Sequence, residues 1–188
     1  MKKFDSFEKE NLKVLGLIVR VKRNKMGYSL RDLAQLTNIS HTLISNFEQG
    51  KLIPNQDTIK DIFSVLDLRF YTDPLISEKF NKLYNTVFNH IIVYEYEDAR
   101  RVIQEIEANQ EQFENSVEAV NYAIIRCLFY SISNMYFADF DRILAQYEVV
   151  VDFLSPNQQQ LYFFVKGLDF VNREYYYDAR KNFEKALE

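Results

Sequence analysis

Apolar and polar positions alternate at helical spacing along the first seventy residues, in four short stretches separated by turn-forming residues. Lysine and arginine crowd the end of the first stretch, where cations favour a helix C-terminus, and Gly27 follows as a stop. The later stretches begin near Ser29, Ser40 and Pro54. The apolar positions of the four stretches are Leu12, Leu15, Ile18 and Val19; Leu30, Leu33, Ala34 and Leu36; Leu43, Ile44 and Phe47; and Ile59, Ile62, Phe63, Leu66 and Leu68. The pattern predicts four short helices joined by tight turns.

The second and third predicted helices form a helix-turn-helix pattern. Ser29, followed three residues later by Asp32, predicts the start of the second helix. Asn38 marks the turn, because asparagine is one of the few types other than glycine that adopts a positive φ. Ala34 is small enough to let the two helices approach, and Ile44 fills the core between them.

These residues lie in register with a known domain. The stretch Ser29–Ala34, followed by Asn38–Lys51 and Pro54, resembles the lambda-repressor-like, or Xre-type, DNA-binding domain. The resemblance covers about residues 12–68. We therefore predict a helix-turn-helix DNA-binding domain over residues 1–70.

The resemblance implies that the helix beginning after Ser40 lies in the major groove of double-stranded DNA, with its first residues at base edges. The exposed side chains predicted there are those of His41, Thr42, Ser45 and Asn46. Asparagine can bond bidentately to adenine, and threonine offers a hydroxyl and a methyl group. His41 suits a contact with guanine or phosphate, and the alternative is an ordinary solvated position on a helix.

Three further residues are predicted to contact phosphates, which position a protein on DNA without specifying sequence. They are Arg31, Lys51 and Ser29, the last through the amides at the start of its helix. The resemblance also implies an ion pair between Arg23 and Glu48 that links the first helix to the end of the third. Glu48 is therefore interpreted as architectural.

Pro74 marks the boundary between the first part of the chain and the second, residues 71–188. The second part contains about six helical segments, each with an apolar stripe flanked by charged residues and glutamine. No alternating run of strand length, bounded by turns, is visible in this part. The predicted fold class is all-α throughout.

An imperfect repeat runs through this second part. Tyr94–Arg100 resembles Glu174–Arg180, and Tyr136–Arg142 resembles both, which gives three helix pairs with a period near forty residues. The last pair carries small and aromatic residues at the spacings of a tetratricopeptide (TPR) repeat, at Gly167, Phe170, Ala179, Phe183 and Ala186. The resemblance implies a TPR-like α-solenoid over residues 71–188, for peptide or protein binding and dimerisation.

A stripe of Tyr122, Arg126, Tyr130 and Asn134 recurs at every fourth position of one predicted helix. Arginine and asparagine can clamp a peptide backbone, so the stripe is a candidate peptide-binding surface. The alternative is that a tyrosine-rich stripe packs one repeat against the next. Cys127 lies among apolar neighbours and is expected to be a buried apolar residue.

Composition narrows the function classes. One cysteine and two histidines among 188 residues exclude a disulfide framework and argue against a metal site, and no cofactor motif is present. No apolar run is long enough to span a membrane, and the N-terminus lacks the apolar core of a signal peptide, so a cytoplasmic protein is expected. The first seventy residues hold 12 Lys/Arg and 8 Asp/Glu, and the remainder holds 11 and 19. The basic part suits a polyanion, and the acidic part would repel one.

The joined architecture resembles the peptide-responsive, quorum-sensing regulators of Gram-positive bacteria, of the Rgg and PlcR type. The resemblance implies a transcription regulator that binds its operator as a homodimer, at the nucleoid, and responds to a peptide or protein held by the repeats. Two alternatives remain open: a TPR-type interaction adaptor, and a phage-type repressor without a small ligand. An enzyme is not expected, because no phosphate-binding loop, metal cluster or catalytic triad is visible. The last helix is apolar without a polar cap after it, so the chain is expected to be truncated or dimeric there.

Overall fold

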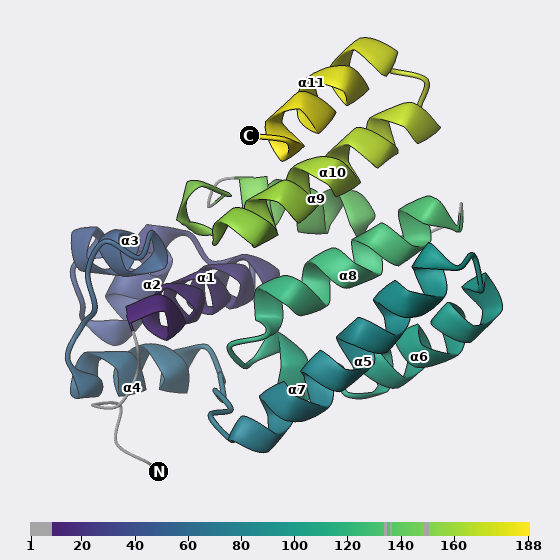
Figure 1. The fold of residues 1–188 in the computed structure, drawn as a ribbon. Helices are drawn as coiled ribbons and strands as arrows, with labels where there is room; N and C mark the ends of the chain where they lie inside the picture. The colour runs from purple at the N-terminus through teal and green to yellow at the C-terminus, as the bar shows by residue number, and fades with distance from the viewer. Residues whose placement is uncertain (1–8, 134, 136, 149–150) are drawn as a thin grey trace. The chain divides into compact units, whose positions relative to one another are not determined.

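The computed structural model describes residues 9–133, 135, 137–148 and 151–188, which are mainly helical (Figure 1). The helices are α1 (Lys9–Lys25), α2 (Leu30–Thr37), α3 (His41–Glu48), α4 (Gln56–Val65), α5 (Pro74–Ile92), α6 (Tyr96–Ala108), α7 (Gln110–Glu114), α8 (Ala119–Ile132), α9 (Phe140–Glu148), the 3₁₀ turn η2 (Val151–Phe153), α10 (Pro156–Asn172) and α11 (Tyr176–Ala186). No strand occurs among the described residues, where an isolated bridge joins Tyr71 to Ser116. The described part of the chain is all-α, as predicted.

The chain divides into two compact units. The N-terminal unit comprises the described part of residues 1–72 together with 115–119, and it contains α1 to α4. The C-terminal unit comprises residues 73–114 and the described part of 120–188. The first residue of α8 belongs to the N-terminal unit, and the rest of that helix belongs to the C-terminal unit.

The core of the N-terminal unit draws on all four of its helices. The buried side chains are those of Leu15, Ile18 and Val19 of α1, Leu33 of α2, Ile44 and Phe47 of α3, Ile59 and Ile62 of α4, and Leu66 and Leu68 beyond it. At Gly16, α1 comes so close to α3 that a Cβ would lie 2.1 Å from the carbonyl oxygen of Phe47. Only glycine permits this approach of a helix to another backbone.

A segment from later in the chain completes this unit. The amide of Tyr71 donates to the carbonyl of Asn115 over 2.7 Å, and Tyr71 forms the parallel bridge with Ser116. Ala119 is 4% exposed and belongs to the same core. Because so short a segment carries no hydrophobic period, the sequence pattern gave no sign of this return.

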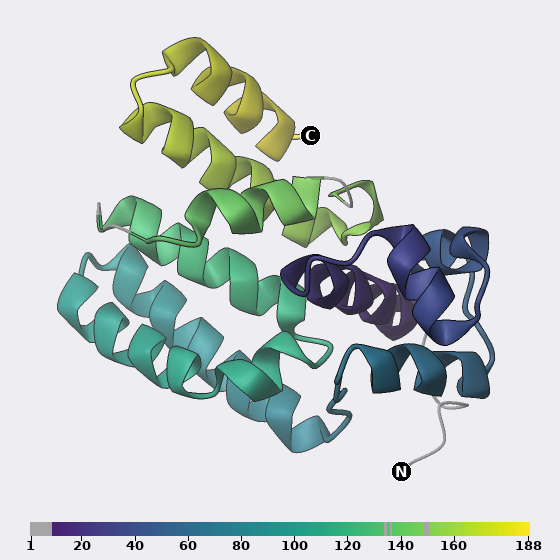
Figure 2. The same ribbon diagram turned by 180° about the vertical axis from the view of Figure 1, so that it is seen from behind.

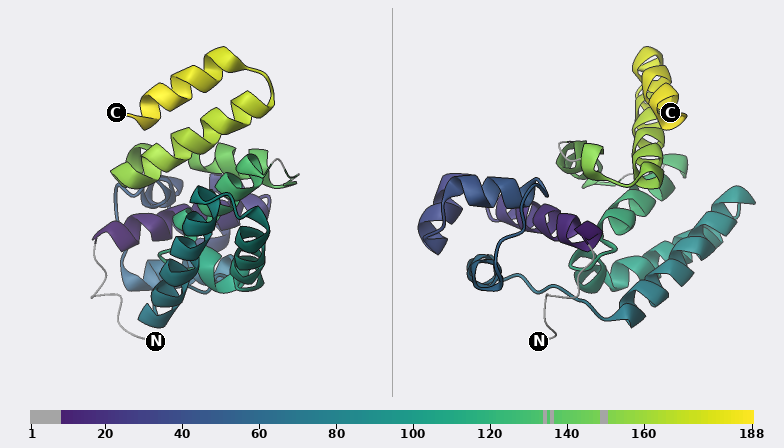
Figure 3. Two further views of the ribbon diagram at one scale, coloured as in Figure 1. Left: turned by 45° about the vertical axis from the view of Figure 1, so that its right-hand side comes forward. Right: turned by 60° about the vertical axis from the view of Figure 1, so that its left-hand side comes forward.

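The C-terminal unit contains two antiparallel helix hairpins, α5 with α6 and α10 with α11 (Figures 2 and 3). Their connecting loops have the same backbone geometry. Tyr94 and Glu174 both adopt a φ of 64°, in the left-handed region. The next residues are Glu95, at φ −85° and ψ 64°, and Tyr175, at φ −88° and ψ 66°. The amide of each donates to the carbonyl five residues earlier. The similar sequence segments that begin at Tyr94 and Glu174, called echoes from here on, therefore form two copies of one loop.

Small residues bring the paired helices together. Ala99 and Ala179, which occupy equivalent positions in the two echoes, are 0% and 3% exposed. In the second hairpin a Cβ at Gly167 would lie 2.5 Å from the ring of Phe183, so the aromatic ring fills the space that the glycine leaves.

The middle pair, α8 with α9, follows the repeat less closely. The amide of Met135 donates to the carbonyl of Tyr130, the same five-residue span as in the other two loops. Tyr136, where the third echo begins, lies outside the described residues. α9 begins at Phe140, although the echo places the helix start at Ala138. The TPR-like solenoid stays a prediction, since its period is not uniform.

α8 lies at the centre of the C-terminal unit and is buried from Tyr122 to Phe129. Gln158 of α10 donates from Nε2 to Asn121 Oδ1 over 3.0 Å, and Asn172 of the same helix donates from Nδ2 to the carbonyl of Ser131 over 3.1 Å. Eight consecutive buried residues span more than two helical turns, so this part of α8 is covered on every side. None of the described helices combines the length and apolar character needed to cross a membrane.

Candidate nucleic-acid interface

A capping box fixes the start of α2. Ser29 Oγ accepts from the amide of Asp32 over 3.1 Å, and the amide of Ser29 donates to Asp32 Oδ2 over 2.7 Å. These bonds from Ser29 lower the pKa of the exposed Asp32 carboxyl from its ordinary value. The hydroxyl oxygen and amide of Ser29, a predicted phosphate contact, are therefore already engaged within the box.

The turn between α2 and α3 is set by local hydrogen bonds. Asn38 adopts the left-handed conformation, at φ 55° and ψ 31°, and the amide of Ile39 donates to the carbonyl of Ala34 over 3.1 Å. Ser40 then caps α3, since its Oγ accepts from the amide of Leu43 over 3.3 Å. The turn and the cap together fix the direction in which α3 leaves α2.

α3 has one buried face and one accessible face. Ile44 and Phe47 are 0% exposed and pack into the core of the N-terminal unit. The four predicted base-contacting residues share the accessible face, with His41 and Thr42 exposed and Ser45 and Asn46 partly exposed. Their spacing along the chain places them on two adjacent turns of one helix side.

Hydrogen bonds within the helix orient some of these side chains. Thr42 Oγ1 lies 3.0 Å from His41 Nδ1, and Gln49 donates from Nε2 to Ser45 Oγ over 3.0 Å. Gln49 was not among the predicted interface residues. Its position four residues after Ser45 is the signal that would have indicated it.

The predicted phosphate-binding cations lie on the elements before and after α3. Arg31 is exposed in the first turn of α2. Lys51 is exposed just after Gly50, which adopts a φ of 64°, and the Lys51 amide donates to the carbonyl of Asn46 over 2.9 Å. The backbone of Lys51 is thus held against the end of α3, and its side chain is exposed.

Arg23 and Glu48 form a buried, bidentate ion pair. Arg23 Nε lies 2.6 Å from Glu48 Oε1 and Nη2 lies 2.7 Å from Oε2, and the two side chains are 9% and 4% exposed. The remaining Nη1 group donates to the carbonyl of Tyr28 over 2.8 Å and to Asn24 Oδ1 over 2.7 Å. The pair joins α1 to the last residue of α3, so it holds α3 in place.

This pair also shapes the charge of the accessible surface. Glu48 is the one acidic residue of α3, and Arg23 neutralises it inside the unit. The accessible face of α3 therefore offers neutral hydroxyl, amide and imidazole groups, with cations on the flanking elements. Neutral donors and acceptors suit base edges, and cations suit phosphates.

The predicted peptide-binding stripe is not one continuous accessible surface, because two of its residues are buried, and the prediction is corrected for those two. Tyr122 is 1% exposed and Arg126 is 7% exposed. Arg126 Nε donates to Glu107 Oε1 over 2.9 Å, and the hydroxyl of Tyr130 donates to the same oxygen over 3.2 Å. Asn134 lies outside the described residues. Arg126 and Tyr130 thus join α8 to α6 through Glu107, which the pattern had not singled out.

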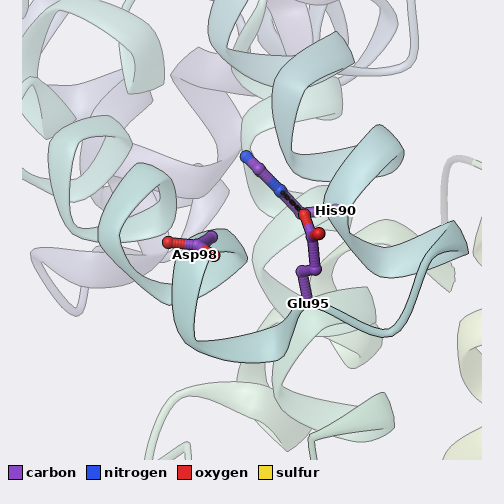
Figure 4. A group of neighbouring side chains, drawn as sticks. All are labelled: His90, Glu95 and Asp98. Atoms are coloured by element: carbon purple, nitrogen blue, oxygen red, sulfur yellow. Dashed lines mark hydrogen bonds and ion pairs between the residues drawn. The ribbon is translucent and has the colours of Figure 1, made fainter.

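One group of three side chains in the described part of the chain has the composition of a metal site (Figure 4). His90, Glu95 and Asp98 each place one potential ligand atom within 4.8 Å of the others. His90 Nδ1 lies 2.8 Å from Glu95 Oε2, and Arg101 donates to Asp98 Oδ1 over 2.8 Å. Each carboxylate thus already has a nitrogen partner, and we interpret the group as a clasp across the α5–α6 loop.

Comparison with known proteins bears on the N-terminal unit. Residues 19–71 match the family model of the helix-turn-helix domain HTH_3. A search of curated proteins and a search of solved structures each found no match. The matched span contains the capping box, the Asn38 turn, the Arg23–Glu48 pair and the accessible face of α3. Residues 19–71 are therefore a helix-turn-helix domain of the Xre, or lambda-repressor-like, type, the domain of DNA-binding transcription regulators.

Proposed function

We propose that the protein is a sequence-specific transcription regulator in which α3 reads base edges in the major groove of an operator. The observation that carries the proposal is the accessible face of α3, where His41, Thr42, Ser45 and Asn46 lie opposite the buried Ile44. In helix-turn-helix proteins the second helix of the motif occupies the groove. Such a regulator works in the cytoplasm, at the nucleoid when bound to its operator.

The proposal assigns different work to different residues. Asn46 reads a base, with adenine as the partner that its amide fits best. Arg31 and Lys51 contact phosphates, and the Ser29 capping box orients the start of α2 beside them. Leu30 packs partly against the core, so the phosphate contacts rest on Arg31 and Lys51.

We further propose that the protein binds as a homodimer and that a peptide or protein ligand controls it through the C-terminal unit. Dimers of helix-turn-helix proteins bind two half-sites about 34 Å apart, one turn of DNA. Support for a ligand-binding role comes from the two hairpins with identical loops at Tyr94 and Glu174, because stacked helix pairs are a common protein-binding architecture.

The test begins with selection of binding sites from a random pool of duplex DNA. A sequence-specific dimer enriches a palindromic motif whose half-site centres are about ten base pairs apart. Fluorescence anisotropy then measures affinity for the selected duplex and for a shuffled duplex, between about 50 and 300 mM salt. Preference for the selected duplex, with a steep loss of affinity as salt rises, supports the proposal.

Two variants separate base reading from phosphate contact. Asn46→Ala is expected to weaken binding to the selected duplex by about 1–3 kcal/mol and to relax the preference at one base position. Lys51→Ala is expected to weaken selected and shuffled duplexes alike and to reduce the salt slope by about one. Equal losses on both duplexes for Asn46→Ala, or a selection that enriches no motif, would contradict sequence-specific reading by α3.

A further inference from the structure

A cavity of about 230 Å³ lies within the C-terminal unit, between α8, α9 and α10. Its lining combines two kinds of side chain. Aromatic and apolar groups come from Tyr130, Phe137 and Phe140, and polar groups come from Ser131, Asp169 and Arg173. The rings of Tyr130 and Phe137 are stacked, with centroids 4.6 Å apart and an interplanar angle of 19°. This volume is below the roughly 300–1,000 Å³ of pockets for drug-sized ligands, so the cavity suits a group the size of one amino-acid residue.

Ser131 lines this cavity, and its side chain carries a buried hydroxyl without a partner among the described residues. The residue is 8% exposed, and among the described residues its Oγ has no hydrogen-bond partner. Ser133, two residues later on the same segment, instead donates to the carbonyl of Phe129 over 2.8 Å. A buried hydroxyl that forgoes this local bond costs free energy, so it is expected to serve another partner.

The charged groups of the lining favour a cation. Arg173 donates from Nε to Asp169 Oδ1 over 2.9 Å and also pairs with Asp141. Two carboxylates against one guanidinium leave one negative charge in excess. The Asp169 side chain is 17% exposed, and burial raises the pKa of its carboxyl from the ordinary value. A bound cation would relieve this cost, because an opposite charge favours the ionised carboxylate.

We propose that this cavity is a binding site for a primary ammonium group carried on a residue-sized apolar or aromatic body. The ammonium donates hydrogen bonds toward Asp169 and Ser131, and the body lies against the stacked rings of Tyr130 and Phe137. The apolar side chains of the lining suit the body, and the Asp169 carboxylate suits the ammonium group. The binding site stands independently of DNA recognition, and its role as a sensor of the regulator rests on the proposed function.

Titration of the full chain with tyramine, followed by amide NMR, tests the site directly. The matched acid 3-(4-hydroxyphenyl)propionate has the same body and the opposite charge, and it is expected not to bind. Asp169→Asn keeps the shape of the side chain and is expected to weaken tyramine binding by about tenfold or more. Glu184→Gln is the control, because Glu184 also pairs with an arginine four residues away, Arg180, on the exposed surface of α11.

Ser131→Ala separates a ligand-binding role from a structural one. Removing a buried, unpartnered hydroxyl is expected to leave the midpoint of thermal unfolding unchanged or higher, and to weaken tyramine binding by about two- to tenfold. Unaltered tyramine binding in both Ser131→Ala and Asp169→Asn would overturn the assignment. So would equal binding of the acid, or the absence of saturable tyramine binding up to millimolar concentrations.

The source of the ammonium group is distinguished by a second pair of probes. Phe-Gly-Gly carries a free N-terminal ammonium, and its N-acetylated form does not. Binding of Phe-Gly-Gly but not of the acetylated form supports the site and assigns it to the N-terminus of a peptide. Binding of tyramine alone supports the site and assigns it to a small amine. These titrations contain no DNA, so failure of sequence-specific DNA binding would leave their result standing.

Discussion

Removal of Glu48 alone should destabilise the N-terminal unit strongly. In Glu48→Leu the guanidinium of Arg23 stays buried but loses both carboxylate bonds, at 2.6 and 2.7 Å, and keeps only Tyr28 and Asn24 as partners. Breaking a buried pair by removing one partner costs about 3–5 kcal/mol, because a charge is left without compensation. The free energy of unfolding of a domain is about 5–15 kcal/mol, so this loss is about a fifth or more of a typical total.

The double variant Arg23→Met/Glu48→Leu distinguishes charge compensation from packing. Replacing a buried pair with apolar residues of similar volume is often neutral or stabilising by about 1–4 kcal/mol. The double variant is therefore expected to be more stable than Glu48→Leu, which is the opposite of additive behaviour.

Urea unfolding followed by amide NMR signals of the N-terminal unit measures these free energies for that unit by itself. Lys60→Gln is the control, because it removes an exposed pair with Asp57 and should change stability by about 0.2–1 kcal/mol. A loss below about 1 kcal/mol for Glu48→Leu would mean that the buried pair contributes no more to stability than an exposed pair does, and it would refute the reasoning. A double variant no more stable than the single one would show that uncompensated charge is not the cause.

Variants at three further positions test local features of the same unit. Gly16→Ala should destabilise it by about 1–3 kcal/mol in urea unfolding despite the better helix propensity of alanine, because the new Cβ meets the backbone at Phe47. Asn38→Val should also destabilise it, by about 1 kcal/mol or more, since a β-branched residue resists a φ of 55°, whereas Asn38→Gly should be close to neutral; a thermal melt compares the two. Ser29→Ala should raise the pKa of Asp32 toward its ordinary value, as measured by carbon NMR of the carboxyl group. Because the pKa of Asp32 is lower in the folded state, the contribution of these bonds to stability is present above the unfolded-state pKa and is lost as pH falls through the folded-state pKa.

The helix-turn-helix could be predicted in detail because its signals are local. Ser29 and Ser40 cap helices through bonds to amides three residues away, and Asn38 makes the turn with its own backbone. The predicted helix start at Ser29 and the predicted turn at Asn38 lie directly before and after α2, which spans Leu30–Thr37 in the structure. The alternation of buried and accessible positions along α3 likewise follows from the helical period alone.

The predicted peptide-binding stripe shows where such signals end. Tyr122 and Arg126 have an apolar body and a polar end, so the same residues can line a groove or fill a core. The choice depends on Glu107, which lies in a different helix and reaches Arg126 only after α6 and α8 pack together. Spacing within one helix carries no information about a partner on another.

The sequence by itself determined the all-α class, the capped helices of the N-terminal unit and the two copies of one hairpin loop at Tyr94 and Glu174, because each depends on hydrogen bonds between near neighbours. Only the tertiary structure decided that residues 115–119 join the core of the N-terminal unit and that Ser131 and Asp169 line one cavity. These features bring together positions far apart in the chain, and such contacts form only when the packing of whole helices has paid the entropy of closing long loops. The accessible face of α3 therefore follows from local sequence, whereas the cavity forms only when the C-terminal unit is folded.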